Sequence, residues 1–396
     1  MMAFKRVGHW LRIQLTSYSF QSDHRAEQAA IQRMFDRHAS KMEGLGPQHY
    51  LWRAICQYRC QIIARKRWVV WLANASALAG LSLVVLLLRR ARPERSKVTC
   101  KYLKVDYHAA YQVPEHIRDF TCEAKLAERY VHLADLRFAF GLFFANGVLY
   151  PELLLKFILW IASVRPYLDH YRCEYLIQYC EYSAHSSLRK VYLNSQGVKI
   201  ANVTHGEEFI SCRSAFSSFD QYHAWELTPR SIHNAMQMEC GERFSFNPCA
   251  SVPRAPQAGR ELVLGFLWPS VEGPDLDVFV EQLNRLSQRY HVIVRPHPNP
   301  RSSNHFNAHR ARLHGEVSDP HKETIHSFID RTGLVVGYLS AVMVQAMYRG
   351  RRVLYLKDAY LASLIEYHDY YKKAPTVTLE ELNNHLSDPA VLQGTM

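Results

Sequence analysis

Residues 334–356 read LVVGYLSAVMVQAMYRGRRVLYL: an apolar run, a short loop, a helix-length stretch and a second apolar run. Ser340 stands where a helix N-cap is expected, and Gly350 stands where a helix would end. The pattern predicts a strand over 334–336, a helix over 340–349 and a strand over 353–356. Such a segment is the repeating unit of a parallel α/β sheet.

The same alternation extends in both directions along the chain. Further strands are predicted at 101–106, 175–179, 198–203 and 219–225, and again at 261–267 and 291–294. The proline-rich segment 247–259 separates the two groups. We therefore predict an α/β fold with two Rossmann-like domains facing across a cleft, 98–250 and 251–396. A basic helical segment, 1–97, precedes them.

The charge of this 396-residue chain is confined to that first segment. Residues 1–97 hold 17 Lys and Arg against 5 Asp and Glu, which accounts for the whole net charge of +12. The neutral remainder argues against a nucleic-acid partner. The composition, 48% hydrophobic and 21% charged, excludes a disordered chain. The nine cysteines follow no metal-site spacing, so we predict reduced thiols and no metal site.

An uncharged run of 21 residues, 68–88, reads WVVWLANASALAGLSLVVLLL and is bracketed by basic clusters on both sides. As a helix it would be roughly 32 Å long, about the thickness of a bilayer's hydrocarbon core. We expect it to associate with a membrane, as a span or as a shallow interfacial helix. A buried scaffold helix is the alternative.

Polar residues directly after predicted strands are candidates for binding, because ligands of parallel sheets bind beyond the carboxyl ends of the strands. Arg295 and His297 follow the strand at 291–294, and both side chains suit phosphate oxygens. Ser340 would offer its hydroxyl and a helix N-terminus to the same phosphate. The structural alternatives are a strand-end ion pair for Arg295 and a plain helix cap for Ser340.

The first domain offers a candidate base. His205 follows the strand at 198–203 and precedes a glycine, and Glu207 or Glu208 could orient its ring or take the base role. Glu181, at another strand end, is a candidate for holding acceptor hydroxyls. The alternative for this loop is a histidine among solvated carboxylates. The chain has no GxGxxG, P-loop, GxSxG or HExxH motif, so no cofactor is predicted.

The strand ending in His205-Gly206, the Arg295-Pro296-His297-Pro298 motif and the Ser340 helix together resemble the GT-B transferases of bacterial surface polymers. The similar group comprises CDP-glycerol glycerophosphotransferases and capsule polysaccharide transferases, including Kdo transferases. The resemblance covers about 98–380, with its specific part at 198–225 and 261–357. It implies that His205 is the catalytic base and that Arg295, His297 and Ser340 bind the donor phosphate without a metal.

The resemblance also implies a CMP- or CDP-linked sugar or polyol donor, a glycan or lipid-linked acceptor and a place at the cytoplasmic face of the inner membrane. One departure bears on the donor. Gln345 stands where the family has a glutamate that contacts the donor ribose, and Arg352 replaces a proline. A UDP- or GDP-sugar donor therefore stays open, as does a non-catalytic membrane scaffold with a degenerate transferase fold.

Overall fold

A computed structural model describes most of the chain. The described residues are 24–44, 46–63, 65–88, 97–105, 113–179, 182–204, 206, 208–250, 262–269, 276–298, 306–357, 361, 371, 373 and 375–388. The chain forms two compact units, Met1–Phe246 and Asn247–Met396, where the sequence suggested a division after residue 250. Each unit is described by itself.

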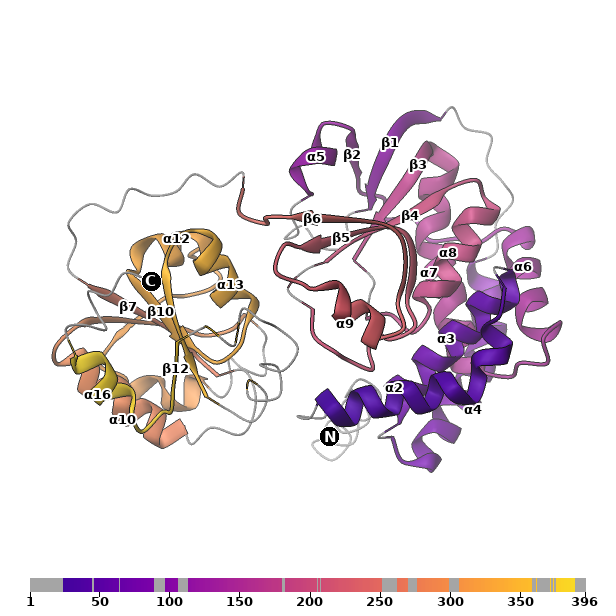
Figure 1. Ribbon diagram of the computed structural model, residues 1–396. Helices are drawn as coiled ribbons and strands as arrows, with labels where there is room; N and C mark the ends of the chain where they lie inside the picture. Colours follow the sequence, from indigo (N-terminus) through magenta and orange to yellow (C-terminus); the bar gives the residue numbers. More distant parts are fainter. Residues whose placement is uncertain are drawn as a thin grey trace, which may run out of the picture. The chain divides into compact units, whose positions relative to one another are not determined.

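The first unit is built on a six-stranded parallel sheet in the order β2-β1-β3-β4-β5-β6 (Figure 1). Its strands are β1 (Val98–Val105), β2 (Thr121–Ala124), β3 (Tyr171–Gln178), β4 (Lys199–Val203), β5 (Ser218–Trp225) and β6 (Glu239–Phe246). The chain runs from β1 to β2 on one side and then returns to β3 on the other side of β1. The direction of winding therefore reverses between β1 and β3.

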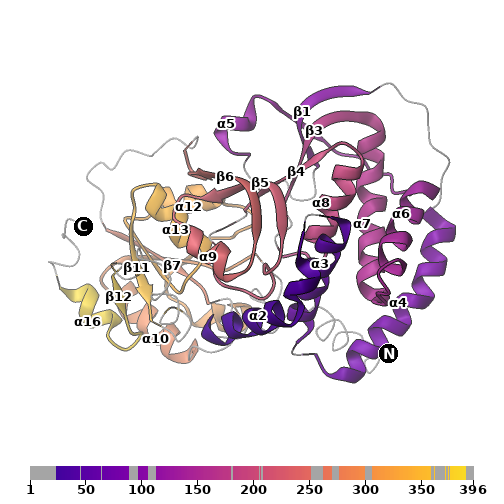
Figure 2. The ribbon, with the colours of Figure 1, turned by 45° about the vertical axis from the view of Figure 1, so that its right-hand side comes forward.

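Most of the helices of this unit lie on one side of its sheet (Figure 2). The helices of the unit are α2 (His24–His38), η1 (Ala39–Met42), α3 (Pro47–Ile62), α4 (Arg67–Leu88), α5 (Glu115–Arg118), α6 (Leu133–Phe144), α7 (Pro151–His170), α8 (Ser186–Ser195) and α9 (Arg230–Ala235). α7 and α8 lie directly on the strands, and α3 packs on α8. The core forms where α7 and α8 meet the sheet.

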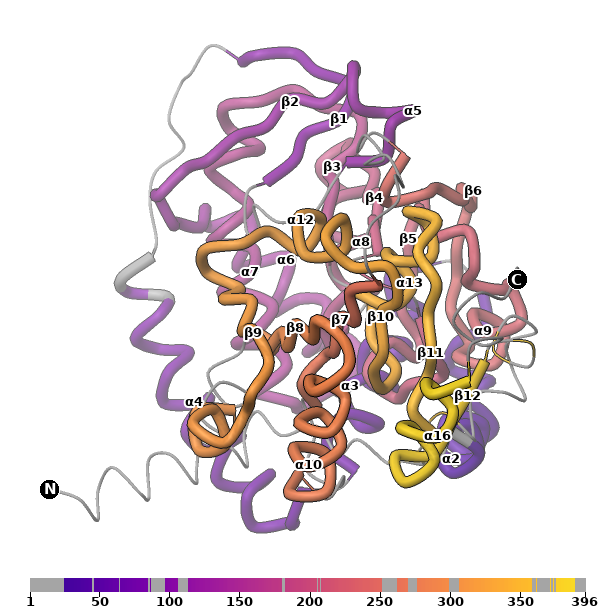
Figure 3. The backbone as a smooth tube through the Cα atoms, turned by 90° about the vertical axis from the view of Figure 1, so that its left-hand side faces the viewer, coloured from indigo at the N-terminus to yellow at the C-terminus, as the bar shows by residue number. Residues whose placement is uncertain are grey.

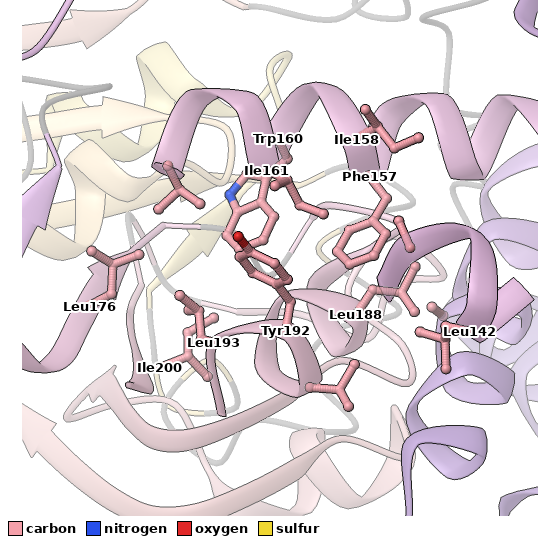
Figure 4. Close-up of a cluster of buried hydrophobic side chains, with 14 of the residues drawn as sticks. Leu142, Phe157, Ile158, Trp160, Ile161, Leu176, Leu188, Tyr192, Leu193 and Ile200 are labelled. Carbon is pink, nitrogen blue, oxygen red and sulfur yellow. The ribbon is translucent and has the colours of Figure 1, made fainter. Parts of the chain in front are cut away.

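Large side chains from α7 and α8 interdigitate in that core (Figure 4). The rings of Phe157 and Trp160 on α7 stack at 6.1 Å between centroids, and both meet the edge of Tyr192 on α8. Apolar area buried in this way contributes roughly 25 cal/mol per Å² to stability. Leu176 of β3 and Ile200 of β4 close the cluster from the sheet side.

The basic helices α2–α4 belong to the first unit. On α3, Leu51, Ile55 and Tyr58 are fully buried in its main core cluster. Arg53 is also buried, and its guanidinium pairs with Glu239 of β6 at 3.0 Å. Part of the positive charge of residues 1–97 therefore has a structural partner inside the unit, which the sequence did not indicate.

The second unit has a six-stranded parallel sheet in the order β12-β11-β10-β7-β8-β9 (Figure 3). Its elements are β7 (Val263–Leu267), α10 (Leu276–Ser287), β8 (His291–Arg295), η2 (Arg310–Arg312), β9 (Glu316–Val317), α12 (Ile325–Arg331), β10 (Leu334–Gly337), α13 (Ala341–Tyr348), β11 (Arg352–Leu356), β12 (Thr376–Val377) and α16 (Leu382–Ser387). This is the strand order of a Rossmann fold. The predicted class, two Rossmann-like units with a helical N-terminal segment, is confirmed.

The period-two alternation of its strands sends neighbouring side chains to opposite faces. Leu264 and Phe266 of β7 join the cluster formed with α10 and α16. Gly265, between them, lies against α12, where a Cβ would stand 2.5 Å from the Thr332 side chain and 2.9 Å from Phe328. The glycine in the middle of this strand therefore lets α12 pack close to the sheet.

α4 lies against α7 at the outer edge of the first unit (Figure 2). By length and composition, it is the one helix among the described residues that could cross a membrane, over Arg67–Val84. Only 17% of that stretch is buried. Its large exposed apolar side chains, called the α4 face below, are Trp68, Trp71, Leu72, Leu78, Leu83 and Leu86.

Candidate functional site

The second unit reverses its winding between β7 and β10. The chain moves outward from β7 to β8 and β9, and then crosses back to place β10 on the other side of β7. In open α/β sheets, ligands bind outside the carboxyl ends of the strands at such a reversal. The described residues at this position are Trp268, which follows β7, and Tyr338 to Ser340, which follow β10.

Ser340 caps the helix that begins at the reversal. It adopts an extended backbone, and its Oγ accepts a hydrogen bond from the Val342 N–H at 3.2 Å. The predicted N-cap is thus found where the sequence placed it. At Gly337, the last residue of β10, a Cβ would lie 3.0 Å from the Cβ of Leu267. This close approach of β10 to β7 brings the α13 N-terminus to the carboxyl end of β7.

Arg295, the last residue of β8, is buried and 7% exposed. Its guanidinium donates to the Ser318 Oγ at 2.6 Å and to the Glu323 carbonyl at 2.9 Å. The same group lies 5.5 Å from the centre of the Phe328 ring. These contacts hold the segment after β9 against β8, so Arg295 stabilises the structure at the end of β8.

His297, two residues further on, is exposed. Partial desolvation by the surrounding chain lowers the pKa of its imidazole, so the ring is neutral near pH 7 and can donate a hydrogen bond to an oxygen. Gln345 lies in the second turn of α13. Its Oε1 is buried and accepts no hydrogen bond within the part of the chain that the structure describes. A hydroxyl donor from a ligand would satisfy it.

The candidate residues of the first unit are only partly visible. His205, Glu207 and Glu181 lie outside the described residues. Glu208 is 1% exposed, and its Oε2 accepts a hydrogen bond from the His233 ring on α9 at 2.7 Å. This buried pair ties the loop after β4 to α9, so Glu208 has a structural partner rather than a solvent-facing carboxylate.

A histidine pair that the sequence analysis missed lies beside this loop. Nε2 of the exposed His116, on α5, lies 3.1 Å from Nδ1 of the fully buried His223, on β5. His223 stacks on Phe244 and pairs in register with Val203, the last residue of β4. An exposed imidazole hydrogen-bonded to a second ring can accept a proton. The period-two placement of His223 among aromatic residues of a buried strand was the signal that could have identified it.

Burial, and then the neighbouring His116, lower the pKa of His223 to about 3. In the unfolded chain, the His223 imidazole would bind a proton below about pH 6.5. In the folded chain, the same imidazole stays neutral down to about pH 3. Stability is therefore lost as the pH falls through this window, on the order of 1 kcal/mol per pH unit for one group. Denaturant unfolding of the wild type and of His223→Gln at several pH values measures this change in the free energy of unfolding. We expect the wild type to lose more stability than the variant on acidification; parallel curves would contradict the assignment.

Comparison with known proteins gives structural similarity only. No protein-family model matches the chain, and no curated protein sequence matches it. Among solved structures, the glycosyltransferase SnogD from Streptomyces nogalater is 11% identical, with a TM-score of 0.42, and the match covers 75% of this chain and 92% of that one. Arabidopsis thaliana UGT89C1 is 10% identical with a TM-score of 0.39, covering 78% and 80%. UDP-GlcNAc 2-epimerase from Neisseria meningitidis, bound to UDP-GlcNAc, is 10% identical with a TM-score of 0.37, covering 74% and 100%.

Proposed function

We propose that the chain is a transferase that takes a glycosyl or polyol-phosphate group from a nucleotide-activated donor bound to the second unit. The observation that carries this proposal is the Ser340-capped N-terminus of α13 at the reversal between β7 and β10. A helix N-terminus at that point of a Rossmann sheet attracts phosphate through its free N–H groups and its dipole.

Three side chains would complete the donor site. His297 donates to a phosphate oxygen, and Gln345 accepts from a sugar hydroxyl. Arg295 acts as a positioning residue, because its hydrogen bonds to Ser318 and Glu323 fix the end of β8 that carries His297. As the donor bond breaks, negative charge grows on the leaving phosphate. The α13 N–H groups, Ser340 and His297 stabilise that charge without requiring a metal ion.

The finer assignment rests on sequence. The resemblance carried by the His205-Gly206 and Arg295-Pro296-His297-Pro298 motifs favours a CMP- or CDP-linked donor and the synthesis of a bacterial surface polysaccharide. In this assignment His205 removes the proton from the acceptor hydroxyl, and that oxygen then attacks the donor. Gln345 is neutral where the similar transferases carry a charged glutamate that contacts the donor ribose. Because this contact differs, the resemblance does not decide the nucleotide, and UDP- and GDP-sugars are the competing donors.

We also propose that the first unit binds the cytoplasmic face of the inner membrane through the α4 face. Exposed Lys66 and Arg67 stand at the amino end of α4, and Arg89, Arg90 and Arg92 follow it in the sequence. Basic residues of this kind are attracted to anionic headgroups by about 1 kcal/mol each. Co-sedimentation of the full chain with lipid vesicles measures this binding.

Nucleotide binding tests the donor site. We expect at least one of CMP, CDP, UDP and GDP to stabilise the full chain in a thermal-shift titration, by about 2.7 kcal/mol at one hundred times its dissociation constant. Ser340→Asp and Ser340→Asn form a matched pair, because both side chains cap a helix but only aspartate repels phosphate.

The aspartate variant should bind the nucleotide at least about tenfold more weakly than the asparagine variant, a difference of about 1.4 kcal/mol. Equal binding by the two variants would show that the nucleotide phosphate does not bind at the α13 N-terminus. Stabilisation by none of the four nucleotides would overturn the donor proposal and favour the non-catalytic scaffold.

A further inference from the structure

A cavity of about 320 Å³ opens at the reversal of the first sheet. Val105 at the end of β1 and Gln178 and Tyr179 at the end of β3 line it, which places it between the two strands where the winding changes direction. α7 contributes Trp160 to its wall, and α8 contributes Arg189. Its volume is at the lower end of the range for small-molecule sites.

Arg189 is held in a fixed orientation at this cavity. Its guanidinium donates to the Gln178 Oε1 and, at 3.0 Å, to the Ser183 Oγ, and it lies 5.1 Å from the Trp160 ring centre. The Trp160 indole N–H donates to the same Gln178 oxygen at 3.3 Å. These contacts hold the planar guanidinium on the aromatic ring, so a fixed positive charge stands at the cavity wall.

The electrostatics of the cavity favour an anion. A second arginine, Arg129, is exposed at its wall, and none of the described residues that line the cavity is acidic. α8 begins at Ser186, three residues after the lining residue Ser183, and no side chain caps its first turn. Burial, and then the charges of Arg189 and Lys156, hold the pKa of the neighbouring His185 well below its usual value. Two arginines therefore line the cavity, and the α8 N-terminus lies three residues from one of its lining residues.

We propose that this cavity binds the phosphate group of a phosphorylated sugar or polyol, and that it is where the acceptor of the proposed transfer is held. The role as acceptor site rests on the proposed function, whereas the binding of an anion does not. The volume leaves room for a monosaccharide-sized group beside the phosphate, and Gln178 and Ser163 supply further polar groups in the wall.

Isothermal titration of the full chain with glycerol 3-phosphate and with inorganic phosphate tests the site. Arg129 is exposed, so Arg129→Gln should leave the fold intact. We expect this variant to bind glycerol 3-phosphate at least about tenfold more weakly than the wild type, as befits the loss of one charge-assisted hydrogen bond. The matched control is Arg172→Gln. Arg172 is an exposed arginine near the amino end of β3, whereas the cavity lies at the carboxyl end of that strand. The control variant should bind as the wild type does.

The outcomes separate the two proposals. If the wild type binds neither compound, or if Arg129→Gln binds as tightly as Arg172→Gln, the anion site is wrong. Tighter binding of inorganic phosphate than of glycerol 3-phosphate would retain an anion site but overturn its assignment to a sugar or polyol. If Arg129-dependent binding is found while no nucleotide binds, the anion site stands and the transferase proposal falls.

Discussion

Replacing Trp71 and Leu83 together by glutamate should abolish binding of the full chain to mixed phosphatidylethanolamine–phosphatidylglycerol vesicles. These side chains are 72% and 57% exposed, and both belong to the α4 face. Transfer of two such groups from water into lipid contributes about 3–6 kcal/mol, and charged replacements are repelled by the anionic headgroups. The partition coefficient should fall by at least about a hundredfold. Vesicle co-sedimentation gives the bound fraction directly.

The matched control is Val98→Glu with Phe120→Glu, which places the same charge on side chains that are 56% and 58% exposed around β1 and β2 of the same unit. This variant should sediment with vesicles as the wild type does. If both variants lose binding alike, net charge rather than the α4 face governs association. Deleting the basic segment would be a poor substitute, because α3 contributes Leu51, Ile55 and Tyr58 to the core.

Within the proposed membrane association, the contacts of α4 favour a helix that lies on the surface over one that spans the bilayer. Asn74 Oδ1 on α4 accepts a hydrogen bond at 3.2 Å from the Glu152 N–H at the start of α7. Three apolar side chains of α4 are also buried: Val69, Ala77 and Leu81. A span would have to break these contacts and expose that side of α7. We therefore expect carbonate washing to release the bound protein from vesicles, and retention after washing would indicate a span.

The elements that follow a strict hydrophobic period could be predicted from sequence. β4, β10 and α13 begin and end within a residue or two of their expected limits, because apolar runs and a capping serine mark them. β6 (Glu239–Phe246) was missed. It is an edge strand with charged residues on both faces, which gives no apolar run.

The candidate site was harder to predict, because its geometry depends on long-range pairing. The sequence located Ser340 at a helix N-terminus, but it gave no sign that Arg295 would be engaged by Ser318 and Glu323. The His116–His223 contact joins residues 107 positions apart, so the sequence could single out His223 in its buried strand but could not show that His116 meets it. Strand order is the missing information, since it alone fixes where the winding reverses.

Arg165→Met should destabilise the first unit by about 3–5 kcal/mol, the second large effect that we expect. Arg165, on α7, is 5% exposed, and its Nε donates to Asp135 Oδ2 at 2.9 Å. Its Nη1 lies 3.6 Å from Asp169 Oδ1, on a carboxylate that also accepts hydrogen bonds from Tyr130 and His132. Removing the guanidinium leaves two buried carboxylates without the cation that contacts both of them, and methionine fills the space without restoring the charge.

Denaturant unfolding followed by tryptophan fluorescence measures this effect, because Trp52, Trp160 and Trp225 report on the first unit. Arg165→Met combined with Asp135→Asn should recover part of the loss, since one of the two unbalanced charges is then removed. Lys199→Met, which breaks an exposed ion pair with Glu174 in the same unit, should leave the unfolding midpoint unchanged. A loss below about 1 kcal/mol for Arg165→Met would show that water reaches the two carboxylates, and that this network does not hold α6 to α7.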